Sequence, residues 1–354
     1  MAGMISPAST AAASLAGIAR MAAASPKLRQ RSDVEYFALQ SRSVLNRESS
    51  GRMPFAWTIN PYRGCEFGCT YCYARYTHEF MEMWDGREFE RKIYAKVNAP
   101  ELLRVELRAA KDKGLPIAIG TATDPYQPAE KQFGITRQLL EVLAEFEALD
   151  FSLSTKSVLL LRDLGLLRLI ARRHCFSVHM TVTTTNERLA RLLEPKAPPP
   201  TKRLEAVSVL VAAGIRVGVM AMPILPALND SPDALEALAR AAARAGAQSL
   251  YGHPLFLTLS TLRQFMPWLE REFPHLVKRY RRLYARSAYL NGEYREQIVK
   301  VVAALRAHYC LDDHREGIAL AARYPQMALP FEGAPEVQQP LALRSPCDAG
   351  SYAW

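Results

Sequence analysis

The chain has 354 residues, of which 49% are hydrophobic, and its 45 basic and 35 acidic side chains give a formal net charge of +10. This composition is ample for one large α/β domain with a smaller extension, and no apolar run approaches the 18 residues of a membrane-spanning helix. Six cysteines in a chain of this length exclude a disulfide framework and favour a reducing, cytoplasmic location.

Residues 1–45 are predicted to form a disordered or loosely ordered tail. The first 32 residues are rich in Ala and Ser and carry Arg20, Lys27, Arg29 and Arg31 without any acidic residue. Such a composition also resembles an organellar transit peptide. A disordered tail on an Ala-rich bacterial chain is the commoner explanation, and we prefer it.

Short β-rich runs then alternate with amphipathic helical segments, which predicts an α/β fold with a parallel sheet. Six such units indicate a partial (βα)6 TIM-like barrel over residues 46–258, with an α-helical extension over 259–325 and a C-terminal tail over 326–354. The predicted strands span residues 56–59, 116–120, 151–155, 176–183, 215–222 and 248–254, and the predicted helices span 136–147, 160–172, 202–213 and 232–245.

Three cysteines, Cys65, Cys69 and Cys72, follow the first predicted strand with the spacing C-x3-C-x2-C. Thiolates are soft ligands that suit zinc or iron–sulfur centres, and such sites normally take four protein ligands. Three ligands on a four-iron cubane leave one iron free for a substrate or cofactor. The alternatives are three unrelated thiols or a zinc site completed by His78, which lies outside the usual zinc-ligand spacing.

The cysteine motif belongs to an ordered series: NPYRGCEFGCTYCYAR, GTATDPYQPAE, STKS, LEPKAPPPTKRLEA and GVMAMPILPALND. From about residue 55 to residue 254 this series resembles the radical S-adenosylmethionine (SAM) superfamily, in particular its spore-photoproduct-lyase-like branch. The resemblance implies one 4Fe-4S cluster that reductively cleaves SAM to begin radical chemistry on an unknown substrate. It also implies an external electron donor, flavodoxin-like or ferredoxin-like.

The resemblance further implies SAM contacts at the carboxyl ends of the strands. Without it, the polar residues there have ordinary explanations: a helix cap or Asx turn, an exposed lysine, β-branched strand residues, and an arginine that caps a helix or forms a surface ion pair. The residues that the resemblance assigns to SAM are Tyr71, Tyr73, Thr123, Asp124, Lys156, Thr183, Thr184 and Arg203.

One departure from spore photoproduct lyase concerns the reaction. Where that family places a hydrogen-donating cysteine, this chain has Thr121, and no cysteine occurs between Cys72 and Cys175. A threonine O–H bond is too strong to serve as the same donor, so the sequence does not predict thymine-dimer lyase activity. Tyr126 is a candidate substitute donor.

A basic, aromatic stretch near the C-terminus leaves a second function open. Such a stretch follows phosphates and stacks bases in nucleic-acid-binding proteins, or forms an ordinary helix with buried tyrosines, which we favour. The alternative function is therefore a zinc- or cluster-containing nucleic-acid-binding protein without SAM turnover. The stretch comprises Lys278, Arg279, Arg281, Arg282 and Arg286, interleaved with Tyr280, Tyr284 and Tyr289.

Overall fold

The computed structural model describes residues 15–49, 53–110, 114–290 and 292–312. Its main sheet has seven strands in the order β11-β10-β9-β8-β7-β4-β3, an open arrangement with β11 and β3 at the edges. Each neighbouring pair from β4 to β11 is parallel, whereas β3 (Leu45–Arg47) runs antiparallel to β4. The parallel strands are β4 (Trp57–Ile59), β7 (Ile117–Ile119), β8 (Asp150–Thr155), β9 (Cys175–Thr181), β10 (Arg216–Ile224) and β11 (Ser249–Pro254). The predicted partial (βα)6 barrel is confirmed.

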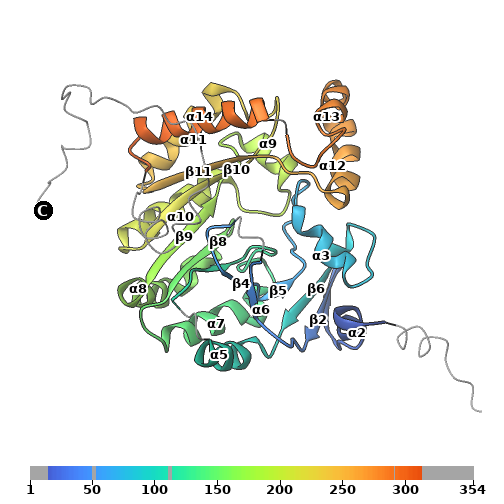
Figure 1. Ribbon diagram of the computed structural model, residues 1–354, viewed down its shortest axis with the longest axis vertical. Coiled ribbons are helices and arrows are strands. Elements are labelled where there is room, and N and C mark those ends of the chain that lie inside the picture. The colour runs from blue at the N-terminus through green and yellow to red at the C-terminus, as the bar shows by residue number, and fades with distance from the viewer. Residues whose placement is uncertain (1–14, 50–52, 111–113, 291, 313–354) are drawn as a thin grey trace, which may run out of the picture.

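Amphipathic helices connect the strands and bury their apolar side chains against the sheet (Figure 1). In α7, for example, Leu139, Leu140 and Leu143 are fully buried, as the helical period predicts. Asn186 and Ser231 accept hydrogen bonds from the first turns of α9 and α11 and so fix where these helices begin. The connecting helices are α5 (Ala99–Ala109), α6 (Glu130–Phe133), α7 (Ile135–Ala144), α8 (Leu164–Arg173), α9 (Glu187–Leu193), α10 (Pro200–Ala212) and α11 (Pro232–Arg244).

A second, four-stranded sheet lies beside the barrel, in the order β1-β2-β6-β5. It combines β1 (Lys27–Arg31) and β2 (Val34–Leu39) with β6 (Lys92–Lys96) and β5 (Tyr62–Arg63), and α2 (Gly17–Ala23) packs next to it (Figure 1). The predicted loose tail over residues 1–45 was therefore wrong for residues 17–39. Val34, Tyr36 and Ala38 alternate inward along β2, so this segment has the period of a half-buried strand despite its Ala-rich approach.

The chain after β11 forms a helical extension, as predicted, in the part that the structure describes. Its elements are α12 (Leu259–Glu272), η3 (Pro274–Leu276), α13 (Val277–Leu283) and α14 (Gly292–His308). Residues 313–325 of the predicted extension and the predicted tail over 326–354 lie outside the described residues. In the described ranges, no helix combines the length and hydropathy that crossing a membrane requires.

The first part of the basic stretch, up to Leu283, lies in the ordinary helix α13, and two of its tyrosines belong to the core. Tyr280 and Tyr284 are buried, and their hydroxyl groups donate hydrogen bonds to the carbonyl oxygens of Pro226 (2.9 Å) and Leu255 (2.8 Å). Neither ring is available to stack on a base. The prediction that these tyrosines are core residues is confirmed.

Candidate functional site

The cysteine loop, residues 64–72, follows β5 and carries all three cysteines of the motif. Cys65 and Cys69 are buried, and Cys72 is partly buried. Gly64 and Gly68 have φ angles of +82° and +63°, which glycine adopts without strain. A Cβ atom at Gly64 would lie 2.7 Å from two backbone carbonyl oxygens, those of Phe89 and Lys92. The tight turn into the loop therefore requires glycine.

Neighbouring elements hold the loop by its backbone. The carbonyl oxygen of Gly64 accepts hydrogen bonds from Thr123 Oγ1 (2.6 Å) and Gln127 Nε2 (3.0 Å). Gln127 Oε1 in turn accepts a bond of 2.9 Å from the amide of Glu66, between the first two cysteines. The loop is thus tied to the chain that follows β7. Sequence reasoning did not assign Gln127, although it stands in the quoted motif GTATDPYQPAE.

Two further side chains hold the loop at Cys69 and Cys72. The guanidinium of the buried Arg75 donates a bond of 3.0 Å to the carbonyl oxygen of Cys69 and pairs with Glu90 at 2.8 Å. Thr261 Oγ1, in α12, donates a bond of 3.2 Å to the carbonyl oxygen of Cys72. Sequence reasoning missed both anchors, because neither depends on the cysteine spacing.

Burial leaves the thiols in a poor environment for negative charge. It raises the pKa of Cys65 well above its usual value and that of Cys69 to about 12. Thiolates at these positions therefore require a metal centre or another cation beside them. Among the described residues, no three His, Cys, Asp or Glu side chains form a group that could share a single metal ion, whereas in a 4Fe-4S cluster each of three cysteines would bind a different iron.

His78, the fourth ligand of the zinc alternative, has a different position. Its Nε2 atom lies 3.0 Å from the carbonyl oxygen of Lys92, and its ring packs against Phe89 and Tyr94. Burial lowers the pKa of His78 to about 4, so the ring is neutral. These contacts explain His78 as part of the packing beneath the loop.

Glu194, at the end of α9, is the centre of a buried polar cluster beside the cysteine loop. Its carboxylate accepts hydrogen bonds from the Tyr71 hydroxyl group and from Thr183 Oγ1 (2.7 Å), and it lies 2.5 Å from Arg203 Nη2. Burial alone would raise the pKa of Glu194, but the charges of Arg203 and Lys156 lower it by more. The net shift of the pKa is downward, so the carboxylate is ionised. This cluster brings together three of the predicted SAM-binding residues.

Arg203 is 1% exposed, and its guanidinium group binds other groups of the protein. Besides Glu194, it donates hydrogen bonds to the carbonyl oxygens of Pro198 (2.7 Å) and Thr181 (3.1 Å). The carboxylate that Arg203 holds is therefore that of Glu194, in a buried ion pair rather than the surface ion pair that the sequence left open.

Lys156 stands just after β8, at the carboxyl end of the strand. Its ammonium group lies 5.8 Å from the centroid of the Tyr71 ring, within the range of a cation–π contact. Burial lowers the pKa of Lys156, but the nearby Cys69 and Glu194 groups raise it more, so the net shift is upward and the group is charged. In the described part of the chain, no carboxylate lies within 4.0 Å of the ammonium group.

Asp124 fixes the position of Lys156 through the backbone. Its Oδ2 atom accepts a hydrogen bond of 2.7 Å from the Lys156 amide, and its Oδ1 atom accepts bonds from Thr155 Oγ1 (2.7 Å) and the Tyr126 amide (2.9 Å). Asp124 thus ties the turn after β7 to the end of β8.

The remaining predicted residues lie around this centre. Tyr73 is 43% exposed and its hydroxyl group donates to the carbonyl oxygen of Thr121. Thr184 Oγ1 accepts a bond of 3.1 Å from the Asn186 amide and so shapes the turn into α9. Tyr126, the candidate substitute donor, is fully buried, and its hydroxyl group donates a hydrogen bond of 3.0 Å to Asp163.

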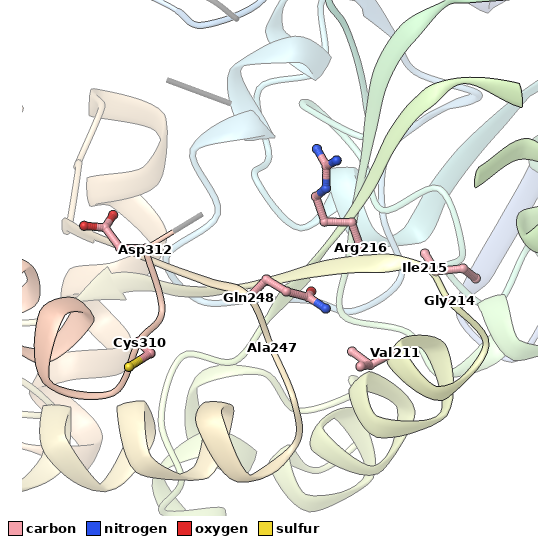
Figure 2. A pocket seen from close by; sticks show the side chains of 8 residues that line it. All are labelled: Val211, Gly214, Ile215, Arg216, Ala247, Gln248, Cys310 and Asp312. Carbon is pink, nitrogen blue, oxygen red and sulfur yellow. The ribbon is translucent and has the colours of Figure 1, made fainter. Parts of the chain in front are cut away.

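A separate cavity of about 540 Å³ lies at the other end of the barrel. Arg216 and Gln248, at the amino ends of β10 and β11, line it together with Cys310 and Asp312 (Figure 2). Because the strands are parallel, this end is opposite to their carboxyl ends, and none of the predicted site residues lines the cavity. The cavity is therefore distinct from the site around the cysteine loop.

Comparison with known proteins agrees with the geometry of this site. Residues 59–241 match the family model described as the radical SAM superfamily. An uncharacterised protein of Mycobacterium tuberculosis is 38% identical over 284 residues, which cover 80% of this chain and 83% of that protein. An uncharacterised protein of Methanocaldococcus jannaschii is 28% identical over 245 residues, covering 69% of this chain and 85% of that protein.

Among solved structures, a spore photoproduct lyase variant with dinucleoside spore photoproduct has a TM-score of 0.57 at 13% identity, covering 82% of this chain and 81% of its own. A second variant, with bound AdoMet and dinucleoside spore photoproduct, has a TM-score of 0.55 at 12% identity, with coverages of 77% and 79%. At this identity the likeness concerns the fold.

Radical SAM proteins use SAM and an iron–sulfur cluster, and the site described above fits these cofactors. The cysteine loop presents three thiols, two of them buried, on a backbone that glycine bends at Gly64 and Gly68. A charged lysine at the end of β8 lies next to that loop. The chain belongs to the radical SAM superfamily and is a radical SAM enzyme.

Proposed function

We propose that the protein reductively cleaves SAM at a 4Fe-4S cluster held by Cys65, Cys69 and Cys72, and so begins radical chemistry on a substrate still to be identified. The observation that carries this proposal is the position of Lys156. Its ammonium group is charged, lies beside Tyr71 of the cysteine loop and has no carboxylate within 4.0 Å in the described ranges. This position supports a pairing of Lys156 with the carboxylate of SAM next to the cluster.

When bound, the cluster supplies the electron that breaks the C5′–S bond of SAM. The protein contributes orientation and the exclusion of water. The buried rings of Phe67 and Tyr71 lie in the same apolar cluster as Cys65 and Cys69, and such shielding tunes the reduction potential of a cluster.

The other predicted residues support this arrangement mainly by positioning. Arg203 and Thr183 act through Glu194, which holds the hydroxyl group of Tyr71 and so sets the ring under Lys156. Asp124 sets the backbone of Lys156. Thr123 sets the carbonyl group of Gly64, at the entry to the loop.

Tyr73 and Thr184 complete the proposed SAM site at its edge. Tyr73 adjoins Cys72 and is half-exposed, and in this proposal its backbone faces the adenine of SAM. Thr184 follows β9 at the carboxyl end of that strand. Both residues therefore stand at the end of the barrel where parallel βα folds place their chemistry.

Thymine-dimer lyase activity is not part of the proposal. Thr121 Oγ1 accepts a hydrogen bond of 3.1 Å from Asn60 Nδ2, so a fixed hydroxyl group stands where the related lyases have a cysteine. Cys175, the next cysteine in the chain, begins β9 and so lies at the opposite, amino end of the barrel. The hydrogen atom in this reaction comes from the substrate or from a group other than a cysteine of the barrel.

The test is anaerobic reconstitution followed by reduction with dithionite in the presence of SAM. We expect about four irons and four sulfides per chain, as in a 4Fe-4S cluster, and 5′-deoxyadenosine among the products. Cys65→Ala, Cys69→Ala and Cys72→Ala should each lose most iron and all SAM cleavage, whereas Cys175→Ala should keep both. Unchanged iron content in the Cys69→Ala protein would overturn the assignment.

A further inference from the structure

The helices that follow the barrel carry a concentrated positive charge. Residues 259–286 contain seven Lys and Arg side chains but only two acidic ones. Two of the arginines are neutralised in the structure: Arg271 pairs with Glu272 and Arg281 with Glu270, each at 2.7 Å. The other five are exposed and have no carboxylate within 4.0 Å in the described part of the chain; we call them the basic face, and they are Arg263, Lys278, Arg279, Arg282 and Arg286.

The inner side of these same helices packs on the cysteine loop. Thr261 in α12 bonds to the carbonyl oxygen of Cys72, and Phe265 and Tyr280 share one apolar cluster with Cys65 and Cys69. In Figure 1, α12 and α13 lie on the same side of the molecule as α3 (Tyr76–Glu79), which comes shortly after Cys72. The basic face is therefore the outer surface of the layer that covers the proposed cluster.

Exposed apolar side chains continue this surface towards the loop. Trp84 is 65% exposed and lines a small cavity of about 150 Å³ together with Arg263. Phe80 and Leu259 are 61% and 75% exposed. Aromatic groups with arginine beside them are typical of the central part of protein–protein interfaces.

We propose that the basic face of α12 and α13, with Trp84 at its border, docks the protein that reduces the cluster, and that this partner is a small acidic electron carrier. The inference rests on the proposed function, because reductive cleavage of SAM consumes electrons that the chain itself does not supply. In each transfer the carrier loses one electron and the cluster gains one, and no atom passes between the two proteins.

Charge and position together favour this partner over a nucleic acid. A cluster needs its donor close by, and the basic face lies one helix layer from the cysteine loop. Positive surfaces of this kind raise association rates with acidic partners by about 10-fold to 1,000-fold at low salt. Of the three interleaved tyrosines, Tyr280 and Tyr284 are buried and hydrogen-bonded, so they are not available for base stacking. The third, Tyr289, is 54% exposed, and its ring packs against that of Phe256.

The experiment compares two ways of reducing the cluster of the reconstituted full-length protein. One reductant is an acidic bacterial flavodoxin in its hydroquinone form, and the other is dithionite, which needs no docking surface. The variant combines Lys278→Gln, Arg279→Gln and Arg282→Gln. We expect its second-order rate of cluster reduction by flavodoxin to fall at least about tenfold at low salt, with a weaker dependence on salt. Its iron content and its reduction by dithionite should match the parent.

A matched triple variant controls for the loss of three charges anywhere on the protein. Arg168→Gln, Arg172→Gln and Arg244→Gln remove exposed arginines from α8 and α11, which cover the barrel away from α12. This control should retain the parental rate with flavodoxin. Equal rates in both triple variants would overturn the proposal.

Two further outcomes separate this inference from the proposed function. If the parent has no cluster that dithionite reduces, the proposed function fails and the docking proposal fails with it. If the cluster is reduced and the basic-face variant instead loses salt-sensitive binding to a single-stranded oligonucleotide while flavodoxin still reduces it at the parental rate, the surface binds nucleic acid and the electron-carrier proposal is overturned.

Discussion

The hydroxyl group of Tyr36 donates a hydrogen bond of 2.9 Å to Glu66 Oε2, and both residues are buried. Tyr36 lies on β2 of the smaller sheet, and Glu66 lies between the first two cysteines of the motif. The N-terminal segment is therefore directly attached to the cysteine loop.

Tyr36→Phe tests this attachment. The change leaves a buried carboxylate oxygen without its donor, so we expect the free energy of unfolding to fall by about 1–3 kcal/mol. Chemical denaturation of the metal-free protein measures this loss. Tyr76→Phe is the control, because the described structure contains no hydrogen bond from the Tyr76 hydroxyl group, and it should change stability by less than about 0.5 kcal/mol. An equally small effect of Tyr36→Phe would contradict the attachment.

Gly64→Ala should disrupt the cysteine loop itself. The new Cβ would lie 2.7 Å from two carbonyl oxygens that belong to the backbone, so the loop must move and most iron should be lost. Gly214→Ala is a matched control, because Gly214 has a similar φ angle of +78° but open space around its Cβ position. Gly214→Ala should lower the free energy of unfolding only by the cost of the left-handed conformation, about 1–2 kcal/mol, and the protein should keep its iron. Iron analysis after anaerobic reconstitution separates the two variants, and full iron content in Gly64→Ala would show that the loop tolerates a side chain.

Lys156→Ala should weaken the binding of SAM without loss of the cluster. A hydrogen bond to a charged group contributes about 1.5–3 kcal/mol, so we expect an increase in Kd of about 10-fold to 100-fold. Equilibrium dialysis with SAM on the reconstituted protein provides the measurement. Lys202→Ala removes an exposed lysine that pairs with Glu205 and should leave Kd unchanged. Parental affinity in the Lys156→Ala protein would refute the proposed carboxylate contact.

Lys96 predicts a pH dependence of stability. It ends β6 in a buried position, and burial, followed by the charge of Arg63, lowers its pKa to about 7. The unfolded chain keeps this proton up to about pH 10.4, so between pH 7 and pH 10 unfolding takes up a proton and the stability of the parent rises with pH. Lys96→Met lacks this group. Its gain in stability over the parent should therefore be largest below pH 7 and shrink towards pH 10.

Denaturant unfolding at pH 6 and pH 9 checks this sign. Lys131→Met, at an exposed position in α6, is the control and should show the same difference from the parent at both pH values. A gain for Lys96→Met that stays constant with pH would mean that the ammonium group keeps its proton in the folded protein.

The barrel was predictable because each of its strands has a recognisable apolar pattern in its own short stretch of sequence. Phe176, Val178 and Met180 of β9 are all buried within one short run, and the helices between strands show their own period. The smaller sheet has no such signal, since β5 has two residues and β2 pairs with β6, more than 50 residues later. The smaller sheet depends on contacts between segments that are distant in the sequence, and no local sequence pattern predicts such contacts.

The same distinction applies to the site. The spacing of the cysteines, and the place of Lys156 after a strand in a recognisable motif, made these residues candidates from the sequence alone. The buried polar cluster around Glu194 was not predictable, because Tyr71, Thr183 and Arg203 come from three separate segments and meet only in the folded chain. Sequence reasoning found these residues individually and assigned them to SAM, whereas the structure shows that they first bind one another.

The hydrogen bond between Thr261 and the carbonyl oxygen of Cys72 joins residues 189 positions apart. On a ribosome that adds about 5–20 residues per second, α12 is synthesised about 10–40 s after the three cysteines. During that interval the nascent chain carries the cysteines without the helix that covers them. We therefore expect a protein that ends before α12 to lose its metal to chelators much faster than the complete one.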